Sequence, residues 1–170
     1  ELHSLAEEAK SLNAYIDNEY PTFNTPGGDI RVKMAEYLQQ TGQAVPQTVG
    51  EWVRCIFESL ALKVKYCADY LKNTLGMPLE DAFVINGGSR NTLLVQLLSD
   101  ALRLPIHAGM PYATLAGNLL TQFYADGKVS SVEEMREVAG RSFQMKEYEP
   151  QPGRDWDAAL QAAVEKNVCH

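Results

Sequence analysis

One long amphipathic segment constrains the fold of this chain more than any other feature. The stretch "PQTVGEWVRCIFESLALKVKYCADYLKNTLG", residues 46–76, repeats its apolar residues at helical spacing. Thr48 and Glu51 form a capping-box pattern at its start, and Gly76 is the stop signal. Because the apolar face is wide, we predict one long and well-buried helix.

The elements around this helix are shorter. Further helices are predicted over residues 1–18, 29–41, 90–101, 111–127, 131–140 and 156–166, with caps at Asp29 and at Ser130 or Ser131. Strands are predicted at Ala82–Asn86 and, more briefly, at 104–107. About six helices thus accompany only two or three strands, which form a narrow platform for an α/β domain. Either the domain is mostly helical, or further strands of its sheet lie outside this chain.

Composition excludes several classes of partner. The 170 residues suffice for about one domain. The net charge is −7, and no basic patch points to nucleic acid. No apolar run reaches the length of a membrane span, and no signal peptide opens the chain, so we expect a cytoplasmic protein. Residue 1 is not methionine, which hints that it is not the natural start.

Cysteine and histidine give no sign of a metal or redox site. Cys55, Cys67 and Cys169 form no CxxC pair, and we interpret them as small buried residues in a reducing compartment. Cys55 has no histidine or other base nearby in sequence, so it is not expected to be a nucleophile. His3, His107 and His170 are far apart, and a zinc site is not expected. His107 is interpreted as a hydrogen-bonded residue at a strand end.

The stretch "FVINGGSRNTLL", residues 83–94, carries the strongest functional signal. A short apolar strand breaks into Gly87 and Gly88, which can adopt positive φ and let a ligand approach the backbone. The following helix start offers free N–H groups, with Ser89 as its candidate cap. Asn91 supplies a donor and an acceptor, which suits a purine or a ribose hydroxyl. A plain tight turn is the alternative; the stretch matches neither a P-loop nor GxGxxG.

The longer segment "INGGSRNTLLVQLLSDALRLPIHAG" resembles the adenosine-binding segment in the C-terminal domain of FGGY carbohydrate kinases. In that family a glycine turn is followed by Ser-x-Asn, then by glutamine and aspartate in the helix. The matching residues here are Gly87, Gly88, Ser89, Asn91, Gln96 and Asp100. Asn86 departs from the pattern, because it stands where the first family glycine often stands.

Two other segments extend the resemblance over roughly residues 20 to 150. The order "FNTPGGDI…TGQAVPQTVGEWVRCIFESLALK" is similar to the rhamnulokinase branch of the family, and "MPYATLAGN" is similar to a later family loop. The resemblance implies an α/β fold of the actin-like ATPase class, built on RNase H-like domains. Residues 1–170 would be the distal, helix-rich and incomplete part of the C-terminal domain. The N-terminal sugar-binding and catalytic lobe would lie outside the chain.

For the whole protein, the resemblance implies transfer of a phosphoryl group from ATP to L-rhamnulose, giving L-rhamnulose 1-phosphate in rhamnose catabolism. Mg²⁺ would bridge the phosphates. The implied partners are the nucleotide and a ketose, with no nucleic acid and no membrane. The catalytic aspartate and the sugar contacts lie upstream in the family, so no catalytic residue is assigned here. We expect the chain alone to be inactive and prone to self-association, since an incomplete sheet exposes apolar surface.

Other functions remain open at this point. The sugar could be xylulose, fuculose or glycerol, because the sugar contacts are not in view. A different class is a non-catalytic helical interaction module, supported by Asn86 in the glycine turn.

The resemblance also implies individual roles. Gly87 and Gly88 would contact adenosine or the α-phosphate region through their backbone, and Asn91 would bond adenine or ribose. Ser89 could cap the helix or contact the ligand. The other matching or neighbouring positions are interpreted as structural or solvated: Arg90, Gln96, Asp100, Thr114, Gly117 and Asn118.

Overall fold

The structure is a computed structural model that describes residues 2–166 and 168. Its elements, in chain order, are α1 (Leu2–Glu8), η1 (Pro21–Asn24), α2 (Ile30–Gln40), α3 (Val49–Thr74), β1 (Ala82–Val84), η2 (Asn86–Arg90), α4 (Thr92–Leu102), β2 (Ile106–Gly109), α5 (Ala113–Ala125), α6 (Val132–Ser142), β3 (Met145–Tyr148) and α7 (Trp156–Glu165). The labels η1 and η2 denote short 3-10 helices. Cys169 and His170 lie outside the described residues.

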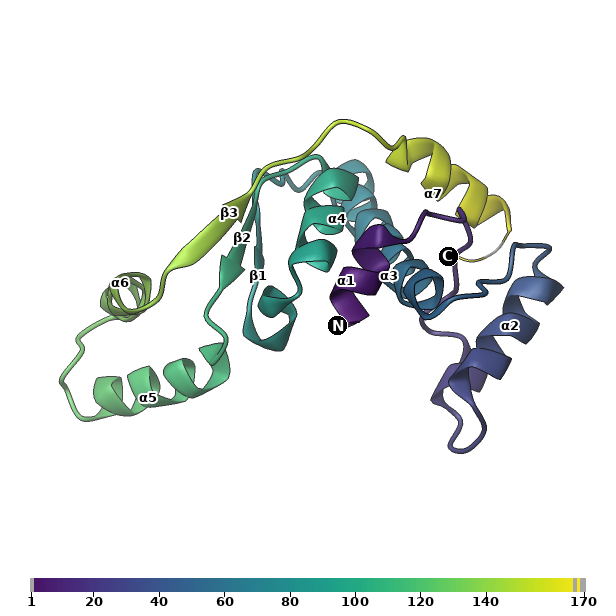
Figure 1. Cartoon of the computed structure of the whole chain (residues 1–170). Coiled ribbons are helices and arrows are strands. Elements are labelled where there is room, and N and C mark those ends of the chain that lie inside the picture. The colour runs from purple at the N-terminus through teal and green to yellow at the C-terminus, as the bar shows by residue number, and fades with distance from the viewer. Residues whose placement is uncertain (1, 167, 169–170) are drawn as a thin grey trace.

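The predicted long helix is confirmed as α3, at the centre of the molecule (Figure 1). Its capping box is present: the Glu51 amide donates to Thr48 Oγ1 at 3.2 Å, and the Thr48 amide donates to Glu51 Oε2 at 2.9 Å. The helices α1, α4 and α7 pack against α3. We refer to these four helices and the segments packed on them as the body.

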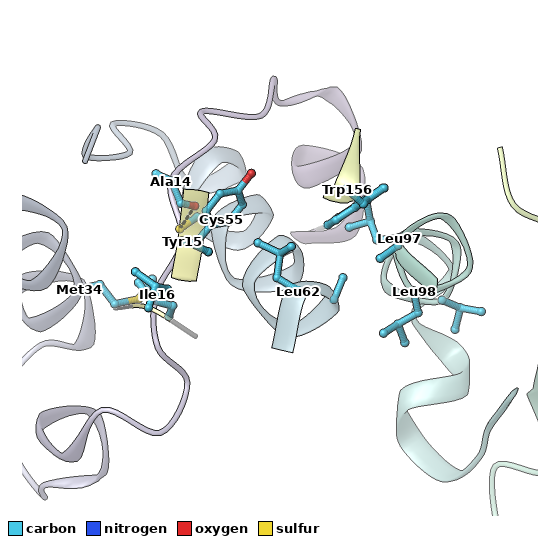
Figure 2. Close-up of a cluster of buried hydrophobic side chains, with 14 of the residues drawn as sticks. Ala14, Tyr15, Ile16, Met34, Cys55, Leu62, Leu97, Leu98 and Trp156 are labelled. Atoms are coloured by element: carbon cyan, nitrogen blue, oxygen red, sulfur yellow. Dashed lines mark hydrogen bonds between the residues drawn. The ribbon is translucent and has the colours of Figure 1, made fainter. Parts of the chain in front are cut away.

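The core of the body is a continuous cluster of buried side chains around α3 (Figure 2). Leu62 of α3, Leu97 and Leu98 of α4, and Trp156 of α7 lie close together there. Leu62 is fully buried. The face of α3 is nevertheless less covered than its pattern predicts, since Val49, Val64 and Cys67 are exposed. The expectation that Cys67 is buried is therefore wrong.

The predicted helix over residues 1–18 is also wrong, because α1 ends at Glu8. The chain then runs irregularly through a buried stretch, residues 14–17. Its amides bond to side chains of other segments: Ile16 N–H donates to Ser59 Oγ at 2.9 Å, and Tyr15 N–H donates to Gln43 Oε1 at 2.9 Å. These tertiary hydrogen bonds take the place of the backbone hydrogen bonds of a helix. The helical spacing of apolar residues in this stretch therefore did not indicate a helix.

A buried ionic network joins the two ends of the chain through α3. The Glu58 carboxylate, about 1% exposed, accepts from Arg54 Nε at 2.7 Å and from Ser11 Oγ at 2.6 Å. Arg154 Nη1 lies 2.8 Å from the same carboxylate, while its Nη2 donates to Asn13 Oδ1 at 2.6 Å. With two guanidinium groups around it, the buried negative charge is compensated.

The sheet has three described strands in the order β1-β2-β3. Strands β1 and β2 pair in parallel, with Ala82 opposite Ile106; β3 pairs antiparallel to β2, with Tyr148 opposite Ile106. The second strand lies two residues later than predicted, and β3 was not predicted. In its sequence, Met-Lys-Glu-Tyr, only Tyr148 is a residue that favours strands, so local propensity gave little signal. The small sheet with many helices confirms the helix-rich α/β class.

The helices α5 and α6 form an arm away from the body (Figure 1). Leu120 is the buried residue of α5, and no residue of α6 is buried. The caps at Asp29 and Ser131 are confirmed, accepting from Arg31 N and Glu134 N respectively. Among the described residues, no helix combines the length and the apolar character that crossing a bilayer requires.

Candidate functional site

The candidate turn follows β1 directly and is tied to the end of β2. Asn86 N–H donates to the Met110 carbonyl at 3.1 Å, which holds the turn beside the loop that leads into α5. The residue with left-handed backbone is Asn86, at φ 59°, whereas Gly87 and Gly88 are not at positive φ. The expectation that the two glycines supply positive φ is therefore wrong. Asparagine tolerates this conformation better than most residues, which accounts for the departure from glycine.

The outer surface of the turn is open. A Cβ atom added at Gly87 would meet nothing within 4 Å, and one added at Gly88 would meet Val84 Cγ1 at 3.5 Å, an ordinary contact. No described atom therefore requires glycine at either position. What the missing side chains provide is access to the backbone at the carboxyl end of a strand, where ligands bind in open α/β sheets.

Asn91, not Ser89, caps the following helix. Asn91 Oδ1 accepts from Leu94 N–H at 3.1 Å, and its own N–H donates to the Gly88 carbonyl at 3.0 Å. Ser89 Oγ instead donates to the Asn86 carbonyl at 2.7 Å inside the turn. The turn inserts η2 before α4, so the cap lies two residues later than predicted. Among the described residues, the Asn91 amide Nδ2 has no hydrogen-bond acceptor.

The start of α5 completes one side of the turn. Thr114 N–H donates to Asn86 Oδ1 at 3.4 Å, and the Asn86 amide reaches Thr114 Oγ1 at 3.5 Å. Arg90 Nη2 donates to Tyr112 Oη at 3.2 Å, with the guanidinium 5.5 Å from the ring centre. Sequence reasoning missed Tyr112, although an exposed aromatic residue shortly after a strand was a usable signal. Arg90 is exposed, as expected, but it has a partner.

The remaining matched residues lie in the scaffold. Gln96 Nε2 donates to Asp100 Oδ1 at 2.8 Å and to the Glu149 carbonyl at 2.9 Å, and Gln151 N–H donates to the same aspartate oxygen at 2.8 Å. Their predicted packing role is confirmed, since they hold the segment after β3. Gly117 does not mark a close packing contact, because a Cβ there would meet nothing within 4 Å. Asn118 is exposed on α5.

The histidine and the cysteine are not part of this site. His107 lies within β2 rather than at a strand end, with Nε2 3.5 Å from Asp81 Oδ2 and its ring stacked on Phe83. Cys55 is buried and its thiol donates to the Ala14 carbonyl at 3.2 Å. Burial raises the pKa of Cys55 to about 12, so it is not a nucleophile at neutral pH. Searching the described part of the chain finds no cluster of metal ligands.

Comparisons with known proteins identify relatives of this chain. The chain is 38% identical to the rhamnulokinase of Bacteroides thetaiotaomicron over 159 residues, covering 94% of this chain and 33% of that protein. It is 35% identical to the rhamnulokinase of Bacillus subtilis over 149 residues, covering 86% of this chain and 30% of that protein. The chain thus spans about a third of the length of these relatives.

A solved structure extends the likeness to the fold. The xylulose kinase from Rhodospirillum rubrum superposes with a TM-score of 0.65 at 15% identity, covering 96% of this chain and 32% of that one. This likeness confirms the expected fold class. Residues 1–125 match the family described as the FGGY family of carbohydrate kinases, C-terminal domain. The chain therefore belongs to the FGGY family of carbohydrate kinases and carries its C-terminal domain sequence.

Proposed function

We propose that this chain forms the nucleotide-binding part of an ATP-dependent rhamnulokinase. The proposed reaction joins a hydroxyl oxygen of L-rhamnulose to the γ-phosphorus of ATP and breaks the bond between that phosphorus and the β–γ bridging oxygen. ADP leaves, and the hydroxyl proton passes to a base. The products are ADP and L-rhamnulose 1-phosphate. Identities of 38% and 35% with proteins named rhamnulokinase support the choice of sugar.

The observation that carries the proposal is the open turn at Gly87 and Gly88. Its backbone is accessible at the carboxyl end of β1, and no described neighbour requires glycine there. The nucleotide would lie over these two residues, with the Asn91 amide donating to adenine or ribose. In such transfers the protein mainly positions the reactants and stabilises charge.

The turn itself fits a nucleotide better than a bare metal ion. Residues 86–91 contain no carboxylate, so Mg²⁺ would bind here through the phosphates, as is usual for this ion. When bound, Mg²⁺ would neutralise phosphate charge. The base that accepts the hydroxyl proton is proposed to lie outside these 170 residues.

Calorimetric titration with ADP and Mg²⁺ tests the nucleotide site. The chain is expected to bind ADP, and Gly88→Arg is expected to abolish the heat of binding by placing a large side chain over the turn. Gly140→Arg is the matched control, because Gly140 is also exposed with nothing within 4 Å of its Cβ position. Equal binding by both variants would contradict the proposed site.

Phosphorylation assays test the reaction and its sugar. The full-length kinase carrying this chain is expected to phosphorylate L-rhamnulose in preference to xylulose, fuculose and glycerol. The chain alone is expected to bind nucleotide without turnover. Faster phosphorylation of another sugar would overturn the substrate, and normal turnover by the 170 residues would overturn the assignment of the base elsewhere.

A further inference from the structure

A polar recess lies at the opposite end of α4 from the candidate turn. It has a volume of about 330 Å³ and is formed where the C-terminal ends of α3 and α4 meet the start of α7. This volume is at the small end of the range for ligand cavities. Since the turn precedes α4 and the recess follows it, this 11-residue helix separates them by about 16 Å. The polar residues that line the recess are Lys65, Asp69, Lys72, Asn73, Arg103 and Asp157.

The walls of the recess carry a surplus of positive charge. Lys65 is about 5% exposed, and its Nζ lies 2.7 Å from Asp157 Oδ1 and 3.0 Å from Asp69 Oδ2. Arg103 Nη2 lies 2.8 Å from Asp157 Oδ2. With Lys72, three cationic side chains line the recess beside two carboxylates, so one positive charge is not compensated. That charge belongs to Lys72, which forms no ion pair with any described residue.

The backbone of Arg103 distinguishes this recess from an ordinary meeting of helix ends. A basic residue in the last turn of a helix is favourable in itself, and this is sufficient to explain the position of Lys72. Arg103, however, has left-handed backbone, at φ 54° and ψ 38°, where helices usually place glycine. Such strain persists where the surroundings or a function compensate for it. The guanidinium is 63% exposed and contacts Asp157 through Nη2, which leaves further N–H groups to donate.

We propose that the recess binds the phosphate group of a small molecule between Lys72 and Arg103. Lys72 would supply a positive charge from α3, and Arg103 would donate hydrogen bonds from the end of α4. A phosphate group presents at least three acceptor oxygens in a tetrahedral arrangement, so both helices can contact it, whereas a carboxylate presents two oxygens in one plane. The buried ammonium of Lys65 compensates the neighbouring carboxylates and thereby weakens their repulsion of an anion. The small volume leaves space for a small organic group beside the phosphate.

Titration of the isotopically labelled chain with inorganic phosphate, followed by NMR at constant ionic strength, tests this proposal. Saturable shifts are expected in the amides of residues 72–79 and 102–104. Lys72→Ala is expected to weaken binding by about tenfold, because it removes a hydrogen bond between charged groups. Lys128→Ala is the matched control, since it removes one positive charge from an exposed site between α5 and α6. Its affinity is expected to equal that of the unmodified chain.

Two substitutions of Arg103 separate its chemistry from its backbone. Arg103→Gly is expected to weaken phosphate binding by about tenfold without lowering the melting temperature, because glycine adopts left-handed backbone without strain. Arg103→Lys keeps the charge but loses the planar fork, and it is expected to weaken binding by about threefold. Binding by Arg103→Gly equal to that of the unmodified chain would overturn the role of the guanidinium.

Several other results would overturn the proposal. Shifts centred on residues 86–91 and lost in Gly88→Arg would place the phosphate at the glycine turn, so this inference would fail while the proposed function stood. No saturable shift at the recess, or equal binding by Lys72→Ala and the control, would show that the recess binds no anion. Acetate bound as tightly as phosphate would contradict the choice of a tetrahedral anion. Glycerol phosphate is expected to bind at least as tightly as inorganic phosphate, and much weaker binding would exclude an organic group.

Discussion

The apolar helices α4 of the body and α5 of the arm use their apolar residues differently. In the body, α4 buries five of its residues, including Val95, Leu97 and Leu98, against α3 and the sheet. In the arm, α6 buries none, and α5 exposes Leu115 and Leu119. Apolar residues in the body thus stabilise the fold, whereas those in the arm form a surface. The comparison predicts that similar substitutions have different effects in the two regions.

The largest effect is expected at the ionic network of the body. Glu58→Ala leaves the guanidinium groups of Arg54 and Arg154 without their carboxylate, which costs about 4 kcal/mol of unfolding free energy. Glu58→Gln keeps the size and hydrogen-bonding oxygen and is expected to cost less. Urea denaturation measures both. A loss below about 1 kcal/mol for Glu58→Ala would show that the network contributes little to stability.

A pair of leucine truncations compares the two regions directly. Leu62→Ala, at a fully buried position of α3, is expected to cost about 3 kcal/mol through lost burial and a cavity. Leu119→Ala, half-exposed on α5, is expected to stay within about 0.5 kcal/mol. Both are read from the same denaturation curves. Equal losses would mean that the arm packs as part of the body.

Removing one helix cap from each region compares the body and the arm through a smaller loss of stability. Thr48→Ala removes the cap of α3 and is expected to cost about 1 kcal/mol in global unfolding. Ser131→Ala removes the cap of α6, and its effect is expected to be confined to the arm. Amide hydrogen exchange distinguishes them: faster exchange in the second variant should be limited to residues 132–142. Faster exchange throughout α3 in that variant would contradict this.

The smallest effect is a pH dependence on the surface of the body. Hydrogen bonding from Lys65, at 2.7 Å, lowers the pKa of Asp157 below its usual 3.8, and Arg103 adds to the effect. The resulting stability is present above pH 3.8 and is lost as the pH falls through the lower folded pKa. The free energy of unfolding is therefore expected to fall less between pH 5 and pH 3 in Asp157→Asn than in the unmodified chain. Urea denaturation at a series of pH values measures this difference.

The fold could be predicted where local signals determine structure. The periodicity of residues 48–76, with its capping box, correctly predicts α3, and Asp29 correctly predicts the start of α2. Prediction from the sequence failed where contacts between distant segments determine the local structure. Residues 9–18 have helical apolar spacing but bond to Ser59 and Gln43, and β3 exists because its backbone pairs with β2. Neither partner is visible in the local sequence.

The candidate turn was predictable in position but not in detail. The glycine pair and the resemblance around it place a candidate turn after β1, and the structure has one there. The assignment of positive φ to the glycines failed, because Asn86 takes that conformation, and the Ser89 cap failed, because η2 shifts the helix start. Tyr112 was missed because its contact with Arg90 depends on how the loop after β2 folds.

The network around Glu58 also has a kinetic consequence. The contact between Arg154 and Asn13 joins residues 141 positions apart, so it closes a loop of almost the whole chain. Closing so long a loop is entropically costly, whereas α3 and α4 lie near each other in sequence. We therefore expect this contact to form after the folding transition state. Arg154→Ala should mainly speed unfolding and leave the refolding rate nearly unchanged.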